Sequence, residues 1–160
     1  MTFRWITAPI LFADLTIVVT GAAAQKRYDT GVSDTEIKIG QTMPYSGPAS
    51  AYATIGKVQA AYFRMINESG GIRGRKITLL SYDDSYNPTK TAEQVRKLVE
   101  SDEVLLTFQI LGTAPNAVVQ KYLNTKKVPQ LFAATGATRF TDPEHFPWTM
   151  GFNPNYQTER

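Results

Sequence analysis

The 160-residue sequence contains no cysteine and a single histidine, His145. Without cysteine it can form no disulfide, no thiolate metal site and no cysteine nucleophile. One histidine without a thiolate leaves too few of the ligands that zinc prefers. The G-x-S-x-G motif, which presents a serine nucleophile in α/β-hydrolases, is also missing. We therefore expect a protein that is not an enzyme and that carries neither a metal nor a cofactor.

Charge is sparse and evenly spread. Charged residues make up 19% of the chain, and the formal net charge is +3. The basic residues are scattered rather than gathered into a stripe that alternates with aromatic residues, as a nucleic-acid surface requires. We expect no nucleic-acid partner.

No apolar run reaches the length of about 20 residues that a transmembrane helix needs. A shorter apolar stretch, Ile6–Val19, follows Arg4 and precedes the small residues Ala22–Ala24. This order is typical of a secretory signal, so we predict a signal peptide over residues 1–24 and a periplasmic location. Asp14 interrupts the apolar stretch. A disordered tail or a wrongly assigned start therefore remains an alternative.

After a predicted linker over residues 25–35, strand and helix patterns alternate. Strands are expected at 37–43, 76–82, 104–110, 130–133 and 148–152. In the first helical segment five apolar residues fall on one helix face: Ile55, Val58, Tyr62, Met65 and Ile66. Gly70 and Gly71 end that helix. Asn87 and Pro88 begin the second helix as cap and first residue.

This alternation predicts an α/β fold with three layers, a Rossmann-like lobe in which helices cover both faces of a mainly parallel sheet. In such sheets ligands bind beyond the carboxyl ends of the strands. Three loops rich in small residues are expected at that edge, at 44–54, 111–116 and 134–140. Small side chains let a ligand approach the backbone closely.

Two adjacent carboxylates, Asp83 and Asp84, end the second strand. No further oxygen ligands stand at calcium-loop spacing beside them. We therefore expect these carboxylates to cap loops or to pair with cations at the strand end.

Six short motifs occur together in this chain: Ile37–Pro48, Asn67–Lys76, Tyr82–Asp84, Asn87–Pro88, Leu111–Thr113 and Ala134–Thr138. By these motifs the sequence resembles the type I periplasmic binding proteins of ABC importers, specifically the leucine/isoleucine/valine-binding family. The motifs span about Thr35 to Glu159 in the family's order. The resemblance implies that residues 36–160 form an incomplete N-terminal lobe, because family members are more than twice as long and place their ligand between two lobes.

The resemblance also implies ligand-binding residues on the three loops. They are Tyr52, Ala114, Pro115, Asn116, Gly136 and Thr138. For Tyr52, stacking on the ligand and anchoring the helix start remain equally open. Thr138 is expected to donate its hydroxyl to a ligand carboxylate, with a turn cap as the alternative.

The implied function is capture of a branched-chain or related amino acid, or a small amide or carboxylate, for import. The implied partners are that small molecule and the membrane permease of an ABC importer. Two other functions stay open. One is a flavodoxin-like domain whose loop over residues 45–54 cradles phosphate, and the other is the ligand-sensing lobe of a receptor.

Overall fold

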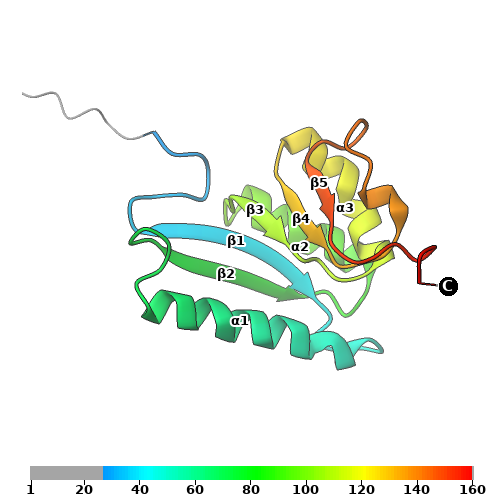
Figure 1. Cartoon of the computed structure of the whole chain (residues 1–160), viewed down its shortest axis with the longest axis horizontal. Helices are drawn as coiled ribbons and strands as arrows, with labels where there is room; N and C mark the ends of the chain where they lie inside the picture. The colour runs from blue at the N-terminus through cyan, green and yellow to red at the C-terminus, as the bar shows by residue number, and fades with distance from the viewer. Residues whose placement is uncertain (1–26, 160) are drawn as a thin grey trace, which may run out of the picture.

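The computed structural model describes residues 27–159, and its strands and helices alternate as predicted (Figure 1). The elements are β1 (Glu36–Met43), η1 (Ser50–Tyr52), α1 (Ala53–Glu68), β2 (Lys76–Asp83), α2 (Pro88–Glu100), β3 (Leu106–Phe108), α3 (Thr113–Lys126), β4 (Gln130–Ala133), η2 (Thr138–Phe140) and β5 (Thr149–Gly151). No helix within residues 27–159 combines the length and the apolar character needed to cross a membrane.

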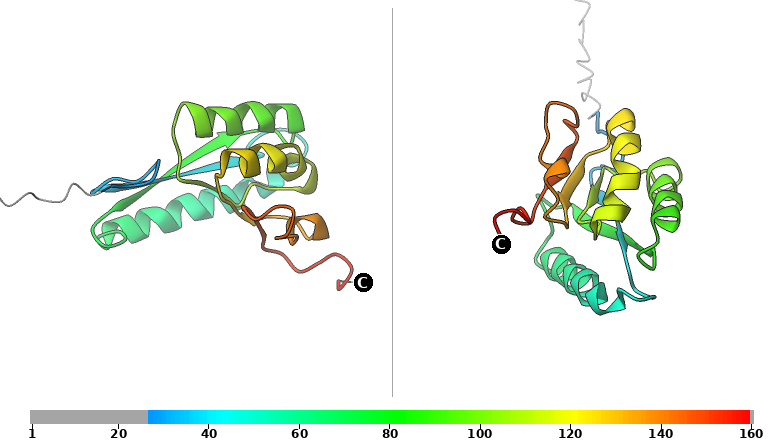
Figure 2. Two further views of the ribbon diagram at one scale, coloured as in Figure 1. Left: turned by 90° about the horizontal axis from the view of Figure 1, so that it is seen from above. Right: turned by 90° about the vertical axis from the view of Figure 1, so that its right-hand side faces the viewer.

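The five strands form one sheet in the order β2-β1-β3-β4-β5, and every neighbouring pair is parallel. Helices α2 and α3 lie on one face of this sheet, and α1 lies on the other (Figure 2). The three-layer α/β prediction is confirmed. Because all strands run the same way, the loops that follow them meet at one edge.

Helices α2 and α3 bury a cluster of apolar side chains against the sheet. Val95, Ile110, Val119 and Leu123 form a buried cluster between these helices and the sheet. Helix α2 begins where the sequence predicts, because the side chain of Asn87 accepts hydrogen bonds from the backbone N–H groups of the first turn at 2.9 and 3.2 Å. Each such bond satisfies an N–H that has no partner within the helix.

The apolar face predicted for α1 is not the face that packs on the sheet. Val58, Tyr62 and Met65 are 61%, 54% and 51% exposed, whereas Ala53 and Gly56 are buried. The first turns of α1 carry small residues on the sheet side because the side chains of Tyr45 and Met43 lie close to the helix there. A Cβ on Gly56 would lie only 2.4 Å from the hydroxyl of Tyr45.

Residues 27–35, predicted as a linker, pack against the start of the sheet. Gly31 adopts a φ of +79° and lies so close to the backbone of Leu105 that a Cβ would approach its nitrogen to 2.2 Å. The guanidinium of Arg75 lies 5.1 Å from the ring centre of Tyr28. This segment therefore closes the amino-terminal edge of the sheet.

Asn87→Ala removes the acceptor at the start of α2 and should lower the free energy of unfolding by about 1 kcal/mol. Asn87→Asp keeps an acceptor and should stay close to the unchanged protein. Urea denaturation of the three proteins measures this. Equal midpoints for Asn87→Ala and the unchanged chain would show that the cap contributes nothing.

Candidate functional site

A cavity of about 690 Å³ opens at the carboxyl edge of the sheet. It is lined by Pro48, Ala49, Tyr52, Ile55, Tyr86, Gln109, Leu111, Gly112, Ala134, Phe152, Asn153 and Tyr156. These residues follow all five strands, and none of them carries a charge. The cavity is therefore built by the loops that the parallel sheet brings together, and its walls are largely apolar.

Aromatic rings form much of the cavity wall. Tyr86 enters it from the loop after β2, where Ser85 and Tyr86 both adopt left-handed backbone conformations with φ of 52° and 58°. The Tyr86 ring lies against Gly112, and a Cβ there would approach the ring to 2.3 Å. Only glycine leaves room for this contact, and Gly112 itself has a φ of +97°. The strained turn and the glycine together place the ring.

Hydroxyl groups join the loops after β3, β4 and β5. The hydroxyls of Thr113 and Thr135 are 2.6 Å apart, and the Tyr156 hydroxyl lies 3.2 Å from that of Thr135. These hydrogen bonds, with the backbone of Gly136, lower the pKa of Tyr156 below its ordinary value. Thr113 is also the first residue of α3, whose amino terminus carries a partial positive charge. The threonines themselves do not line the cavity, but Gly112, the cap residue of α3, does, so this corner suits an anionic oxygen better than a cation.

A chain of side-chain amides leads from the sheet interior to the cavity. Ser81 donates to Oε1 of the buried Gln41 at 2.9 Å. Gln41 Nε2 donates to Gln59 Oε1, and Gln59 Nε2 donates to Gln109 Oε1. Gln109 lines the cavity. The chain holds the carboxamide of Gln109 in place and gives the otherwise apolar floor a polar group.

Residues 36–159 match the model of a protein family described as periplasmic binding protein. The chain belongs to this family. No curated protein sequence matches it.

Solved structures share the fold of this periplasmic binding protein. A possible leucine/isoleucine/valine-binding protein from Rhodopirellula baltica is 23% identical over 78% of the chain, with a TM-score of 0.71. A substrate-binding periplasmic protein from Ralstonia solanacearum is 28% identical over 77%, with a TM-score of 0.69. A fatty acid ABC transporter substrate-binding protein from Thermomonospora curvata is 28% identical over 64%, with a TM-score of 0.56.

The chain corresponds to only part of these proteins. It covers 33%, 35% and 26% of the three solved chains in the same order. The type I periplasmic binding fold is thus shown for one lobe.

The structure places the residues predicted to bind ligand at different points of this edge. Tyr52 lines the main cavity. Gly136 and Thr138 line a neighbouring hollow of about 310 Å³, and Tyr156 borders both spaces. Ala114 is exposed at the start of α3 and lines neither space.

Pro115 and Asn116 are buried inside the first turns of α3. The amide nitrogen of Asn116 donates to the carbonyls of Ile110 and Gly112 at 2.6 and 2.8 Å, and its oxygen accepts from Gln130 at 2.8 Å. Asn116 therefore ties α3 to β3 and β4. Its side chain supports the floor of the site from below.

Six cavity residues lie outside the three loops considered in the sequence: Ile55, Tyr86, Gln109, Phe152, Asn153 and Tyr156. Tyr86 follows β2 and the last three follow β5, and the loops after those two strands were not among the three considered. Applying the carboxyl-edge rule to every predicted strand would have pointed to these four residues.

The two carboxylates at the end of β2, Asp83 and Asp84, act as predicted. Asp83 accepts from the backbone N–H groups of Ser46 and Ser85 at 3.1 and 3.0 Å and pairs with Lys90 at 3.1 Å. Asp84 accepts from the hydroxyl of Thr91 at 2.9 Å. Burial raises the pKa of Asp83, but the hydrogen bonds outweigh it and hold the pKa well below its ordinary value. Asp83 thus ties the first loop to the second.

The pKa of Asp83 is lower in the folded protein than in the unfolded chain. The stability that this carboxylate contributes is therefore complete above the ordinary pKa of 3.8. It is lost as the pH falls from that value through the lower pKa of the folded protein. Asp83→Asn should cost about 1–2 kcal/mol at neutral pH. It should also make stability decline less steeply on acidification. Denaturation curves from neutral to acidic pH test this, and parallel pH profiles for both proteins would contradict it.

Proposed function

We propose that this chain captures a small solute for an ABC importer and releases it chemically unchanged. The observation that supports this most strongly is the uncharged, largely apolar cavity at the carboxyl edge of five parallel strands in a member of the periplasmic binding protein family. A concave apolar site with a few fixed polar groups suits binding of a small molecule.

The proposed solute is a branched-chain or related amino acid, or a small amide or carboxylate. The amino terminus of α3, which reaches the cavity at Gly112, suits its carboxylate, and the rings of Tyr52 and Tyr86 suit an apolar body. No acidic side chain among the described residues lines the cavity. We therefore assign recognition of an ammonium group to the second lobe of a chain with the relatives' length.

A phosphate-binding, flavodoxin-like role is less consistent with the first loop. The backbone N–H and the hydroxyl of Ser46 both donate to Asp83, at 3.1 and 2.6 Å. A phosphate there would lose these donors and would meet a carboxylate of like charge.

In this proposal residues 1–24 direct export and are removed, residues 36–160 form the binding lobe, and the completed protein meets a membrane permease. Residues 1–26 lie outside the described part of the chain. Expression in a Gram-negative host should give a periplasmic protein that begins at Gln25, as N-terminal sequencing would detect. Soluble cytosolic protein that retains Met1 would remove the case for export.

One lobe supplies only about half of the contacts of a closed cleft. If the complete protein binds at about 1 μM, half of that free energy corresponds to about 1 mM. We expect millimolar binding of one solute from a panel of amino acids, fatty acids and hydroxybenzoates, measured by ligand-observed NMR. Micromolar or tighter binding by this chain would overturn the half-site account.

Tyr86→Ala and Tyr52→Ala should each weaken that binding severalfold through lost ring contact. Thr138→Ala tests whether the ligand reaches the smaller hollow, because Thr138 lines that hollow and not the main cavity. It should weaken binding only if the ligand carboxylate lies in the smaller hollow. Lys121→Ala changes an exposed side chain on α3 and serves as the control. Binding that is unchanged by both tyrosine substitutions would remove the main cavity as the site.

A further inference from the structure

The chain leaving β3 breaks the alternation of side chains that a regular strand shows. Phe108 faces α1, because its ring centre lies 5.5 Å from that of Phe63. Ile110 faces the opposite side of the sheet, where it packs in the buried cluster with α2 and α3. Residues two apart in a regular strand share a face. One residue is therefore inserted between these two, and that residue is Gln109, which bonds to Gln59 of α1.

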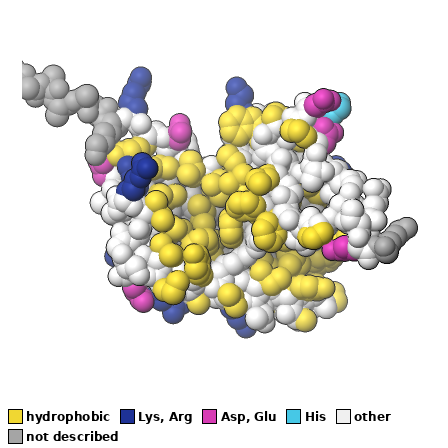
Figure 3. Space-filling model, in the orientation of Figure 1, with side chains coloured by type: hydrophobic (Ala, Val, Ile, Leu, Met, Phe, Trp, Pro, Cys, Tyr) yellow, Lys and Arg dark blue, Asp and Glu magenta, His cyan; other side chains and the backbone are white. Residues whose placement is uncertain are grey.

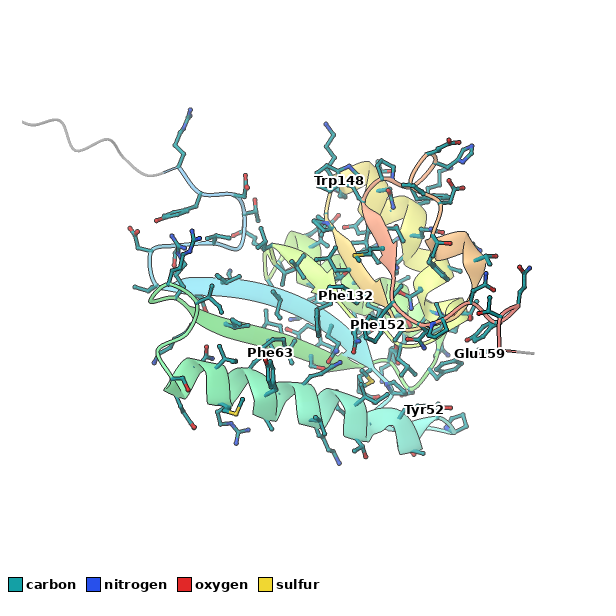
Figure 4. All side chains as sticks on the ribbon, in the orientation of Figure 1. Tyr52, Phe63, Phe132, Trp148, Phe152 and Glu159 are labelled. Atoms are coloured by element: carbon teal, nitrogen blue, oxygen red, sulfur yellow. The ribbon has the colours of Figure 1, made fainter. Side chains whose placement is uncertain are left out.

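A left-handed backbone conformation produces this break. Gln109 has a φ of 48°, which few residues other than glycine adopt, and Phe132 on the neighbouring strand β4 has a φ of 56°. The backbone N–H of Gln109 still donates to the carbonyl of Leu131 at 2.9 Å. Phe132 lies in a row with Phe63 and Phe152 that runs from α1 toward β5 (Figure 4). Irregularities of this kind re-aim a side chain, and here Gln109 turns toward α1 and the cavity instead of the core.

A series of hydrogen bonds sets which way the Gln109 carboxamide points. Ser81 donates to the oxygen of Gln41, the nitrogen of Gln41 donates to Gln59, and the nitrogen of Gln59 donates to the oxygen of Gln109. Bonds that run in one direction polarise and strengthen one another. The oxygen of Gln109 is therefore occupied and its nitrogen is turned onward. That nitrogen, Nε2, has no hydrogen-bond partner among residues 27–159.

The surroundings of this nitrogen hold few other polar groups. The described cavity wall contains no charged residue, and Figure 3 shows charged side chains mainly at the margin of this face. One further carboxamide, that of Asn153, lines the cavity, but Asn153 is exposed whereas Gln109 is partly buried. A hydrocarbon group placed over a partly buried N–H donor removes its water without replacing the hydrogen bond.

We infer that Gln109 determines the specificity of the cavity by donating a hydrogen bond from Nε2 to an oxygen of the solute. The inference rests on the proposed function of solute capture and narrows the solute class. The solute is a small carboxylate whose body carries a further oxygen acceptor: a hydroxyl, a carbonyl or a carboxamide. Solutes with a plain hydrocarbon body are disfavoured, because a site built to hydrogen-bond such a group rejects the analogue that lacks it.

Pairs of probes with nearly equal shape test the inference: threonine against valine, asparagine against leucine, and para-hydroxybenzoate against para-methylbenzoate. Both members of a pair carry the same carboxylate, so the ratio of their dissociation constants reports on the body alone. In ligand-observed NMR on the unchanged chain, the oxygen-bearing member of at least one pair should bind about fivefold tighter or more. The side-chain amide resonance of Gln109, identified by its loss in Gln109→Met, should shift with that member and not with its partner.

Two substitutions separate contact with the solute from a purely structural role of Gln109. Gln109→Glu keeps an oxygen that accepts from Gln59 but removes the donor. Gln109→Met removes both groups without adding a charge. Each should bring the ratio of the two dissociation constants to about one. Gln94→Met makes the same exchange on α2, on the opposite side of the sheet, and should leave the ratio as it is in the unchanged chain.

The possible outcomes distinguish this inference from the proposed function. Equal binding of both members in every pair, or tighter binding of the hydrocarbon member, overturns the role of Gln109 and leaves solute capture standing. A preference that persists in either Gln109 variant also overturns it, because the solute oxygen is then recognised by another group or Gln109 acts only as a structural tie. Absence of binding by all six probes and by the rest of the solute panel overturns solute capture, and this inference with it.

Discussion

The parallel pairing of all five strands is the constraint on which the rest of the structure depends. Because each strand runs the same way, five loops end at one edge, and residues as distant in sequence as Pro48 and Tyr156 line a single cavity. The same pairing requires crossovers, which place helices over the faces of the sheet. Where a crossover lacks a long helix, as between β4 and β5, one face of that part of the sheet has no helix over it among residues 27–159.

Close contact between glycines and aromatic rings orders the carboxyl edge of the sheet. Gly112 accommodates Tyr86, and Gly136 accommodates both the carbonyl of Pro154 and the ring of Tyr156, which a Cβ would approach to 2.5 Å. These contacts hold the rings in place without a covalent link. The sequence has no cysteine, so no disulfide supplements these contacts. Rigid rings lose little conformational entropy when a solute arrives.

Local patterns predicted the fold well where local chemistry decides it. The strand at 37–43 and the capped start of α2 at Asn87 agree with the structure within one residue. The strand predicted over residues 104–110 is shorter, because only Leu106–Phe108 pair in the ladder. Val104 and Ile110 are buried but lie outside the strand. An apolar run in the sequence indicates burial and does not show which of its residues pair in the sheet.

Long-range contacts set the limits of prediction at the site. Asn116 was expected on a loop but lies in α3, and its side chain is engaged by Gln130, a partner from another strand that periodicity does not reveal. The apolar face of α1 was recognised correctly as a face. The direction in which that face turns depends on Asn67 and Gln59, whose hydrogen-bond partners lie on β2 and after β3.

Solute capture at the carboxyl edge is tested most directly by NMR chemical-shift mapping on isotope-labelled chain during solute titration. The account predicts that one solute shifts the resonances of Tyr52, Tyr86 and Tyr156 together, with one saturation curve, and leaves Trp148 unchanged. Shifts confined to residues away from this edge, or saturable binding without change at these three tyrosines, would contradict it.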